Sequence, residues 1–256
     1  MTSFVLVHGS WHGAWCWYKV APRLRALGHE VIVPELPSHG RDRTPPQEVA
    51  IQDYVDPVAG AIDGAREPVV LVGHSRGGLV ISQAAEARAE RVRTLVYLAA
   101  YLLRDGDTVL DWAPSDTGSL VMTNLDIAED GSWDMLREEA FDAALYADCT
   151  AEDRALAHAL LSPEPTAPSL TPLRLTPERY GRVPRAYVEL TQDRAVTPAL
   201  QRRMREATPC ARVTALAAGH SAYFSMPDAL ARELLALAVD PGLAPAAEDA
   251  TPAVAA

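Results

Sequence analysis

Short runs of apolar residues recur along the chain and alternate with stretches whose apolar residues follow helical spacing. The predicted strands are residues 3–7, 30–33, 69–72, 92–100, 185–190 and 211–216, and the predicted helices are residues 15–27, 51–65, 198–207 and 227–239, with a further helix after Gly78. Unbroken apolar runs of this length are typical of strands that are buried on both faces of a parallel sheet. The alternation therefore predicts an α/β fold with a mainly parallel sheet and helices on both of its faces.

The alternation is interrupted once. Between residues 105 and 180 the pattern predicts only two helices, at 135–147 and 151–161, and these are followed by a proline-rich run. We interpret residues 105–180 as a cap that is inserted into a core made of residues 1–104 and 181–240. Residues 241–256 are rich in alanine and proline and carry no packing pattern, so we expect a disordered tail there.

Charge and cysteine content indicate which partners and which cell compartment this protein has. The chain has 34 acidic and 23 basic side chains, for a net charge of −11, and no basic cluster, which argues against nucleic acid or a membrane surface as a partner. Its three cysteines are at no metal-binding spacing and indicate free thiols in a reducing compartment. The N-terminal apolar run is too short for a signal-peptide core, and no apolar stretch approaches membrane-spanning length. We therefore expect a cytoplasmic protein.

Candidate chemistry begins at the turn after the third predicted strand. The turn reads Gly73-His74-Ser75-Arg76-Gly77, which is a G-x-S-x-G motif between a strand and a helix. A serine on such a sharp turn holds a strained backbone conformation and exposes its hydroxyl, while the flanking glycines let strand and helix approach closely. Ser75 is therefore a candidate nucleophile. The alternative is a glycine-rich turn in which Ser75 only caps the helix.

A serine nucleophile needs a base, and the base needs a carboxylate that holds its tautomer. Among the seven histidines, His220 has the best context because it follows the last predicted strand, and Asp193 follows the strand before it. Both residues are thus predicted at the carboxyl edge of the sheet, where the sites of open α/β sheets form. Asp105, after the fourth strand, is an alternative acid, although an Asp-Gly pair is also typical of a turn.

The loop after the first strand reads His8-Gly9-Ser10-Trp11-His12 and lies at the same predicted edge. A tetrahedral oxyanion needs two preorganised N–H donors. We expect the backbone N–H groups of Ser10 and Arg76 to supply them. We interpret His8 and His12 as residues that shape this loop through hydrogen bonds.

The side chain of Arg76 has two interpretations. It can be a solvated residue at the helix N-terminus, which we favour, or it can face an acidic substrate or a carboxylate of the cap.

These motifs together carry a family resemblance. The matching stretches are residues 4–17, 27–31, 71–78, 183–185, 191–193 and 219–220. They resemble the α/β-hydrolase superfamily and, more narrowly, the plant methylesterase and hydroxynitrile lyase group and its bacterial relatives. The resemblance implies an α/β-hydrolase fold with a sheet of about six strands. It also implies Ser75 as nucleophile, His220 as base, Asp193 as its acidic partner, and an oxyanion hole at Ser10 and Arg76.

Two positions separate the esterases of this group from its lyases. The similar lyases carry threonine after the first loop histidine and lysine after the catalytic histidine, whereas this chain has Gly9 and Ser221. The resemblance therefore favours a serine esterase that hydrolyses a small or medium apolar ester. The sequence has no cluster of metal ligands, so we expect a mechanism without cofactor or metal. A cyclase, acyltransferase or lyase on the same residues is the alternative, and a non-catalytic small-molecule receptor is a third reading. A homodimer is a possible assembly in this group.

Overall fold

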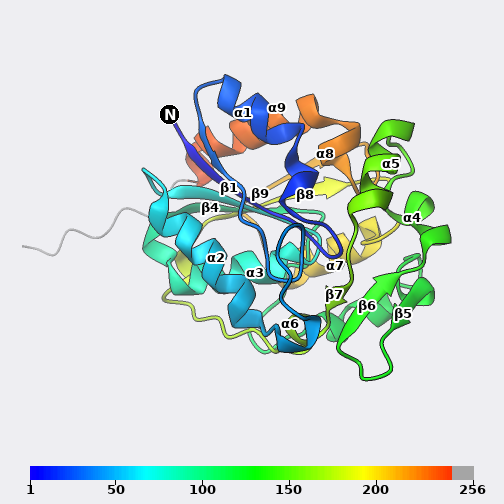
Figure 1. The fold of residues 1–256 in the computed structure, drawn as a ribbon. Helices are drawn as coiled ribbons and strands as arrows, with labels where there is room; N and C mark the ends of the chain where they lie inside the picture. The colour runs from blue at the N-terminus through cyan, green and yellow to red at the C-terminus, as the bar shows by residue number, and fades with distance from the viewer. Residues whose placement is uncertain (244–256) are drawn as a thin grey trace, which may run out of the picture.

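The computed structural model describes residues 1–243. Six parallel strands form one sheet in the order β2-β1-β3-β4-β8-β9. Figure 1 shows this sheet between two layers of helices. The strands are β1 (Ser3–Val7), β2 (Glu30–Ile32), β3 (Val69–His74), β4 (Val92–Leu98), β8 (Arg185–Leu190) and β9 (Arg212–Leu216). The chain thus has the α/β architecture that the alternation of strands and helices predicts, and the expectation of about six strands, which the resemblance implied, is confirmed.

Helices cover both faces of the sheet. The helices α1 (Val20–Ala26) and α9 (Pro227–Val239) lie on one face, and α2 (Ile51–Gly64), α3 (Gly77–Ala87) and α7 (Pro198–Ala207) lie on the other (Figure 1). In β1, Phe4 and Leu6 pack with the first group and Val5 and Val7 with the second. Successive side chains of a strand point to opposite faces, so a strand covered on both faces needs apolar residues at every position. This is why residues 4–7 of β1 and 69–72 of β3 read as unbroken apolar runs.

The strand order changes direction at β1. From β1 the chain first adds β2 on one side, and then returns to place β3 on the other side of β1. Consequently the connections that follow β1 and β3 leave the sheet toward opposite faces, which opens a crevice at the carboxyl ends of these two strands. The loop that begins at His8 and the turn at Ser75 both lie at this crevice.

Residues 105–180 carry a second, antiparallel sheet, which the sequence pattern did not predict. Its strands are β5 (Leu125–Ile127), β6 (Trp133–Leu136) and β7 (Glu164–Pro165), and the accompanying helices are α4 (Glu138–Leu145), α5 (Ala151–Leu160) and α6 (Ala167–Leu170). Figure 1 shows these elements at one side of the main sheet. We keep the name cap for residues 105–180.

The helix predicted at residues 135–147 is wrong at its start. Met135 and Leu136 belong to strand β6, which pairs with β5, and Arg137 donates its backbone N–H to the carbonyl of Asn124 at 2.8 Å. Only α4 is helical in this stretch, whereas α5 is helical nearly as predicted. Pairing with a strand distant in sequence therefore overrides the local helical spacing.

The C-terminal part folds back on the sheet as far as residue 243. The helix α8 (Ala222–Ser225) precedes α9, and a short 3-10 helix at Pro241–Leu243 follows it. Leu243 is buried, and its carbonyl accepts a hydrogen bond from the Thr94 hydroxyl at 3.1 Å. These three residues thus have structure where a disordered tail was expected, and the rest of that prediction, residues 244–256, falls outside the described residues. Within the described part of the chain, none of the helices combines the length and the hydropathy that crossing a membrane requires.

Candidate active site

Ser75 occupies the sharp turn between β3 and α3. Its φ is +54°, in the left-handed region that a non-glycine residue enters at a cost of about 1–3 kcal/mol. The Ser75 carbonyl accepts the backbone N–H groups of Gly78 at 3.1 Å and of Tyr101 at 3.0 Å, so the turn is held from two sides. A Cβ atom at Gly77 would lie 2.7 Å from the carbonyl oxygen of His8, which explains why glycine follows the serine so closely. This is the strained, close-packed turn that the motif predicts.

His220 and Asp193 meet beside this turn. The Nδ1 atom of His220 lies 2.7 Å from Oδ2 of Asp193, and the two side chains are 3% and 0% exposed. The other carboxylate oxygen, Oδ1, accepts the backbone N–H groups of Ala195 at 2.7 Å and Val196 at 3.0 Å. Both oxygens of Asp193 are therefore used, and the pair holds His220 in the tautomer that leaves Nε2 without a proton.

His74 supports His220 from the other side. Its Nε2 lies 2.9 Å from the backbone carbonyl of His220, and the two rings are 4.4 Å apart. Burial lowers the pKa of His74 well below its ordinary value, so the ring is neutral. A carbonyl only accepts hydrogen bonds, and Nε2 of His74 must therefore carry the proton.

The loop after β1 approaches Ser75 closely. A Cβ atom at Gly9 would lie 2.8 Å from the Cβ atom of Ser75 and 3.0 Å from the carbonyl oxygen of His74. His8 holds the Gly9 carbonyl through Nδ1 at 3.0 Å and accepts the backbone N–H of Leu36 through Nε2 at 3.3 Å. Burial lowers the pKa of His8 to about 3, which keeps the ring neutral and able to make both bonds. The peptide that carries the Ser10 N–H is thereby fixed in orientation.

The next peptide is held by His12. Its Nδ1 donates to the Ser10 carbonyl at 2.7 Å, and its Nε2 accepts the hydroxyl of Tyr146 at 2.7 Å. Burial also lowers the pKa of His12 to about 3. Both loop histidines thus shape the loop, as the sequence indicated. Among the hydrogen bonds between described residues, none uses the backbone N–H of Ser10 or of Arg76.

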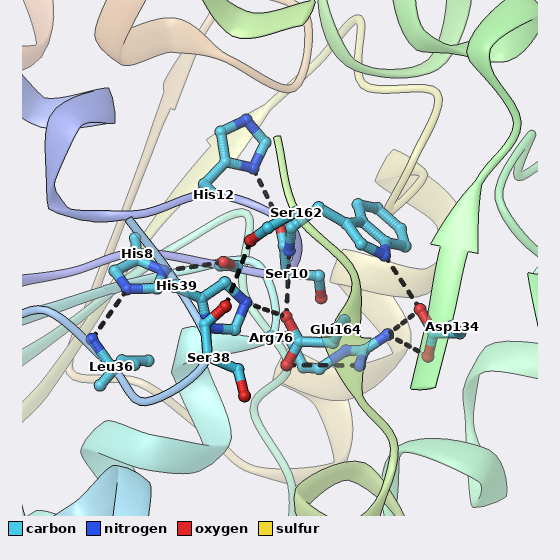
Figure 2. A network of polar contacts seen from close by, with 12 residues as sticks. His8, Ser10, His12, Leu36, Ser38, His39, Arg76, Asp134, Ser162 and Glu164 are labelled. Atoms are coloured by element: carbon cyan, nitrogen blue, oxygen red, sulfur yellow. Dashed lines mark hydrogen bonds and ion pairs between the residues drawn. The ribbon is translucent and has the colours of Figure 1, made fainter. Parts of the chain in front are cut away.

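The side chain of Arg76 is not solvated, and the interpretation that we favoured from the sequence is wrong. It is only 11% exposed, and its Nη2 lies 3.2 Å from Oδ2 of Asp134 while its Nη1 lies 3.6 Å from Oε1 of Glu164. Figure 2 shows Arg76 between these two carboxylates, which come from strands β6 and β7 of the cap. The alternative that we left open, a cap carboxylate, describes the contact that forms.

A cavity of about 320 Å³ joins these residues. Ser75, His220, Ser10 and Arg76 all line it, so the candidate nucleophile, base and oxyanion donors share one space. Most of the remaining wall is aliphatic and belongs to the cap, which contributes Val109, Val121, Leu125, Ile127 and Leu170. The cap also contributes Asp134, and the core contributes Val196. The cavity therefore suits an apolar molecule with one reactive polar group next to Ser75.

Asp105, the alternative acid, and His158, another of the seven histidines, have other partners. Asp105 accepts the backbone N–H of Leu175 at 2.8 Å and precedes Gly106, which has a φ of +81°, so it acts as a turn residue. His158 lies on α5 and contacts Asp142 at 3.0 Å. Neither residue lines the cavity. Within residues 1–243, no group of three or more histidine, cysteine, aspartate or glutamate side chains is arranged to hold a metal ion.

Sequence reasoning missed two residues of this region, Asp134 and Glu164. Both are buried, at 6% and 2% exposure, although they lie in a stretch without regular periodicity. No local signal distinguishes them from the other acidic residues of the cap, because only the antiparallel sheet brings them to Arg76.

Comparison with known proteins agrees with the fold. The sequence pattern described as the alpha/beta hydrolase family matches residues 4–233. Methylesterase 9 of Arabidopsis thaliana is 30% identical over 252 residues, which cover 93% of this chain and 98% of that protein.

Two solved structures are similar over nearly the whole chain. A pyrethroid hydrolase from Sphingobium faniae JZ-2 superposes with a TM-score of 0.83 at 27% identity and covers 94% of this chain and 98% of its own. Tomato methylketone synthase I complexed with 2-tridecanone also gives a TM-score of 0.83, at 28% identity, and covers 93% of this chain and 97% of its own.

Proposed function

This chain belongs to the alpha/beta hydrolase family and is a hydrolase of that class, and we propose that it is a serine carboxylesterase with Ser75 as nucleophile. In this proposal His220 is the general base and acid, and Asp193 is the carboxylate that orients it. One observation carries the proposal: Ser75 and His220 line the same cavity, and His220 makes its 2.7 Å hydrogen bond to Asp193 on the side away from the reaction.

The proposed reaction has two halves. His220 Nε2 takes the hydroxyl proton of Ser75 while Oγ attacks the acyl carbon, and the oxyanion that forms accepts the backbone N–H groups of Ser10 and Arg76. The protonated His220 then gives its proton to the leaving alcohol, and an acyl-enzyme on Ser75 remains. Water, deprotonated by the same histidine, attacks this ester, and the acid leaves with Ser75 restored. Asp193 stabilises the imidazolium in both halves.

The substrate that we propose is a small or medium apolar ester. The aliphatic walls of the cap support it, because burial of apolar substrate surface against them contributes about 25 cal/mol per Å². The relation to a methylesterase makes a methyl ester a natural first test.

Gly9 and Ser221 support hydrolysis over cyanohydrin cleavage. Gly9 leaves no side chain beside Ser75, where a Cβ atom would come within 2.8 Å. Ser221 is fully buried and donates its hydroxyl to Tyr223 at 3.0 Å, so the position after His220 presents no cation to the cavity.

A second candidate function is a non-hydrolytic biosynthetic reaction on the same residues: a cyclase, acyltransferase or lyase. The likeness to tomato methylketone synthase I favours it, together with a cavity that is lined mostly by apolar side chains. In such an enzyme a nucleophile other than water, or an internal group of the substrate, would resolve the intermediate.

The deciding experiment is the intact mass of the protein after brief exposure to a fluorophosphonate, beside hydrolysis assays with p-nitrophenyl acetate and butyrate. We expect one phosphonyl adduct on Ser75, turnover of both esters, and loss of adduct and turnover in Ser75→Ala with the fold retained. An adduct without turnover would favour the second function. A wild-type protein that forms no adduct would contradict the assignment of Ser75.

We also propose a cytoplasmic location. The three cysteines support it, because Cys16, Cys149 and Cys210 are all free thiols in the structure. The homodimer remains a prediction, which analytical ultracentrifugation would check.

A further inference from the structure

Two carboxylates of the cap lie side by side and contact Trp11 and Arg76. Asp134 of β6 and Glu164 of β7 are paired across the antiparallel sheet. Besides their contacts with Arg76, Oε2 of Glu164 accepts His39 Nε2 at 2.9 Å, and Oε1 accepts the Tyr54 hydroxyl at 2.9 Å. We call Asp134 and Glu164 the carboxylate pair; Figure 2 shows it with Arg76 and His39.

The carboxylate pair also holds Trp11. The backbone N–H of Trp11 donates to Oε2 of Glu164 at 3.0 Å, and its indole Nε1–H donates to Oδ1 of Asp134 at 3.0 Å. Its carbonyl accepts the backbone N–H of Ser162 at 2.9 Å. All three hydrogen-bonding groups of Trp11 are therefore bound by residues of the cap, although Trp11 belongs to the loop after β1.

Trp11 needs this support because of its backbone conformation. Its φ is +61°, in a region that bulky side chains enter rarely. Such a conformation persists only where the surroundings over-determine it, and such residues cluster at functional sites. The peptide between Ser10 and Trp11 is thereby held at both ends, by His12 at its carbonyl and by Glu164 at its N–H.

The same pair holds the residue that carries the second donor. Arg76 binds Asp134 and faces Glu164, while its own backbone N–H is the other candidate donor of the oxyanion hole. Burial alone would raise the pKa of Glu164, but the facing His39 and Arg76 lower it to about 2, so this carboxyl is ionised at any working pH. The two candidate donors, 66 positions apart in the sequence, are thus tied to one ionic cluster in the cap.

We propose that Asp134 and Glu164 are positioning residues for ester hydrolysis, which from the cap hold Trp11 and Arg76 so that the N–H groups of Ser10 and Arg76 meet the oxyanion. This inference rests on the proposed function. In this proposal the geometry of the oxyanion hole depends on the contact between the cap and the core. Among the described residues neither carboxylate forms a hydrogen bond with Ser75; Asp134 lines the cavity, whereas Glu164 does not.

The test compares isosteric variants. Both oxygens of the Glu164 carboxylate accept hydrogen bonds. In Glu164→Gln an NH₂ group replaces one of these oxygens, and it cannot accept the hydrogen bond that was made there. Asp134→Asn weakens the contacts to Arg76 and to the indole of Trp11. The matched control is Asp126→Asn on β5, because Asp126 also pairs with an arginine of the cap, Arg137 at 2.8 Å, but on the exposed surface.

The readouts are kcat and KM for p-nitrophenyl butyrate and the affinity for a trifluoromethyl ketone, which binds as a hemiketal oxyanion. We expect kcat to fall by about 10–100-fold in both variants with KM within about threefold, because an oxyanion hole acts on the transition state and not on the bound ester. The ketone should lose affinity by the same factor as kcat/KM. The control Asp126→Asn should match the wild type in every readout.

The outcomes separate this inference from the proposed function. If the wild type hydrolyses the ester but both variants match Asp126→Asn, or lose activity through KM alone, the positioning role is wrong and the carboxylate pair only anchors the cap. If Glu164→Gln does not fold, Asp134→Asn carries the test by itself. If the wild type neither turns over esters nor reacts with a fluorophosphonate, the proposed function fails first.

Discussion

The Nδ1 atom of His220 lies 2.7 Å from Oδ2 of Asp193, while Oδ1 of the same carboxylate accepts two backbone N–H groups. An asparagine at position 193 would keep its carbonyl oxygen toward those N–H groups and turn its NH₂ toward His220. The amide would then donate to Nδ1 and force the proton onto Nε2, which is the wrong tautomer for a base. Asp193→Asn should therefore lower kcat by about 10³–10⁴-fold with the fold intact.

Asp105→Asn is the matched control for this prediction. Its amide oxygen can still accept the N–H of Leu175, and it lies outside the cavity. Steady-state assays with p-nitrophenyl butyrate should give a rate within about threefold of the wild type for this variant. Equal losses in Asp105→Asn and Asp193→Asn would reverse the assignment of the acid.

The contact between Gly9 and Ser75 gives a second prediction. In Gly9→Ala the new methyl group would meet the Cβ atom of Ser75 at 2.8 Å, and neither position can move without shifting the backbone. Displacement of a reacting group by about 1 Å costs about 10²-fold, so the rate of fluorophosphonate labelling should fall by that order. Gly60→Ala on α2, where nothing lies within 4 Å of the new methyl group, should label at the wild-type rate. Labelling of Gly9→Ala at the wild-type rate would mean that the loop after β1 can shift to accommodate the methyl group without displacing Ser75.

The buried pairing of Arg76 gives a third prediction, on stability. Arg76→Met removes the cation that Asp134 and Glu164 share and leaves two buried carboxylates short of a partner. Loss of one member of a buried ion pair costs about 3–5 kcal/mol in the free energy of unfolding. Urea unfolding should detect this loss, and Asp134→Asn in the same chain should recover part of it.

Arg88→Met supplies the comparison, since Arg88 pairs with Asp63 on the exposed surface. Its free energy of unfolding should stay close to that of the wild type, because exposed ion pairs contribute little. Were Arg76→Met and Arg88→Met equally stable, the cluster around Arg76 would not hold the cap to the core.

Buried histidines give a fourth prediction, on the pH dependence of stability. Burial lowers the pKa of His8 and His12 to about 3 and that of His74 well below its usual value. In the unfolded chain these rings take up protons near pH 6.5, and the folded protein does not. The free energy of unfolding should therefore fall as the pH drops below 6.5, by up to about 1.4 kcal/mol per pH unit for each histidine.

Two groups act in the opposite sense. Burial would lower the pKa of His39, but Glu164 outweighs it and raises that pKa, so the stability from this pair is lost as the pH rises above 6.5. Burial raises the pKa of Asp134, which favours the folded state toward low pH. Below pH 6.5 the three buried histidines lower the stability, and of the two opposing groups only Asp134 raises it. Urea unfolding at pH 7, 6 and 5 should therefore show a decreasing free energy of unfolding. The slope should be shallower in His12→Gln, and a flat profile in the wild type would contradict the buried neutral state of these rings.

Much of the core was predictable from local pattern. Strands β1 and β3 read as apolar runs because both faces of the sheet are covered. Strands β1, β3 and β8 end within a few residues of Ser10, Ser75 and Asp193, respectively. The carboxyl ends of parallel strands share one edge of the sheet, so the sequence pattern alone predicts that these residues lie close together. The cap was different: residues 135–136 follow helical spacing but form part of β6, since their pairing with β5 is not local.

The amino-acid sequence by itself determined the order of strands and helices, the turn at Ser75 and the edge of the sheet where Asp193 and His220 lie. Those features follow from side-chain periodicity and from glycine at positions without room for a Cβ atom, both of which act over a few residues. Only the tertiary structure decided that Arg76 is buried and that Asp134 and Glu164, 58 and 88 positions later, bind it and hold Trp11. Such contacts depend on how two distant segments pack, because the desolvation that makes a charge seek a partner exists only once the chain has folded.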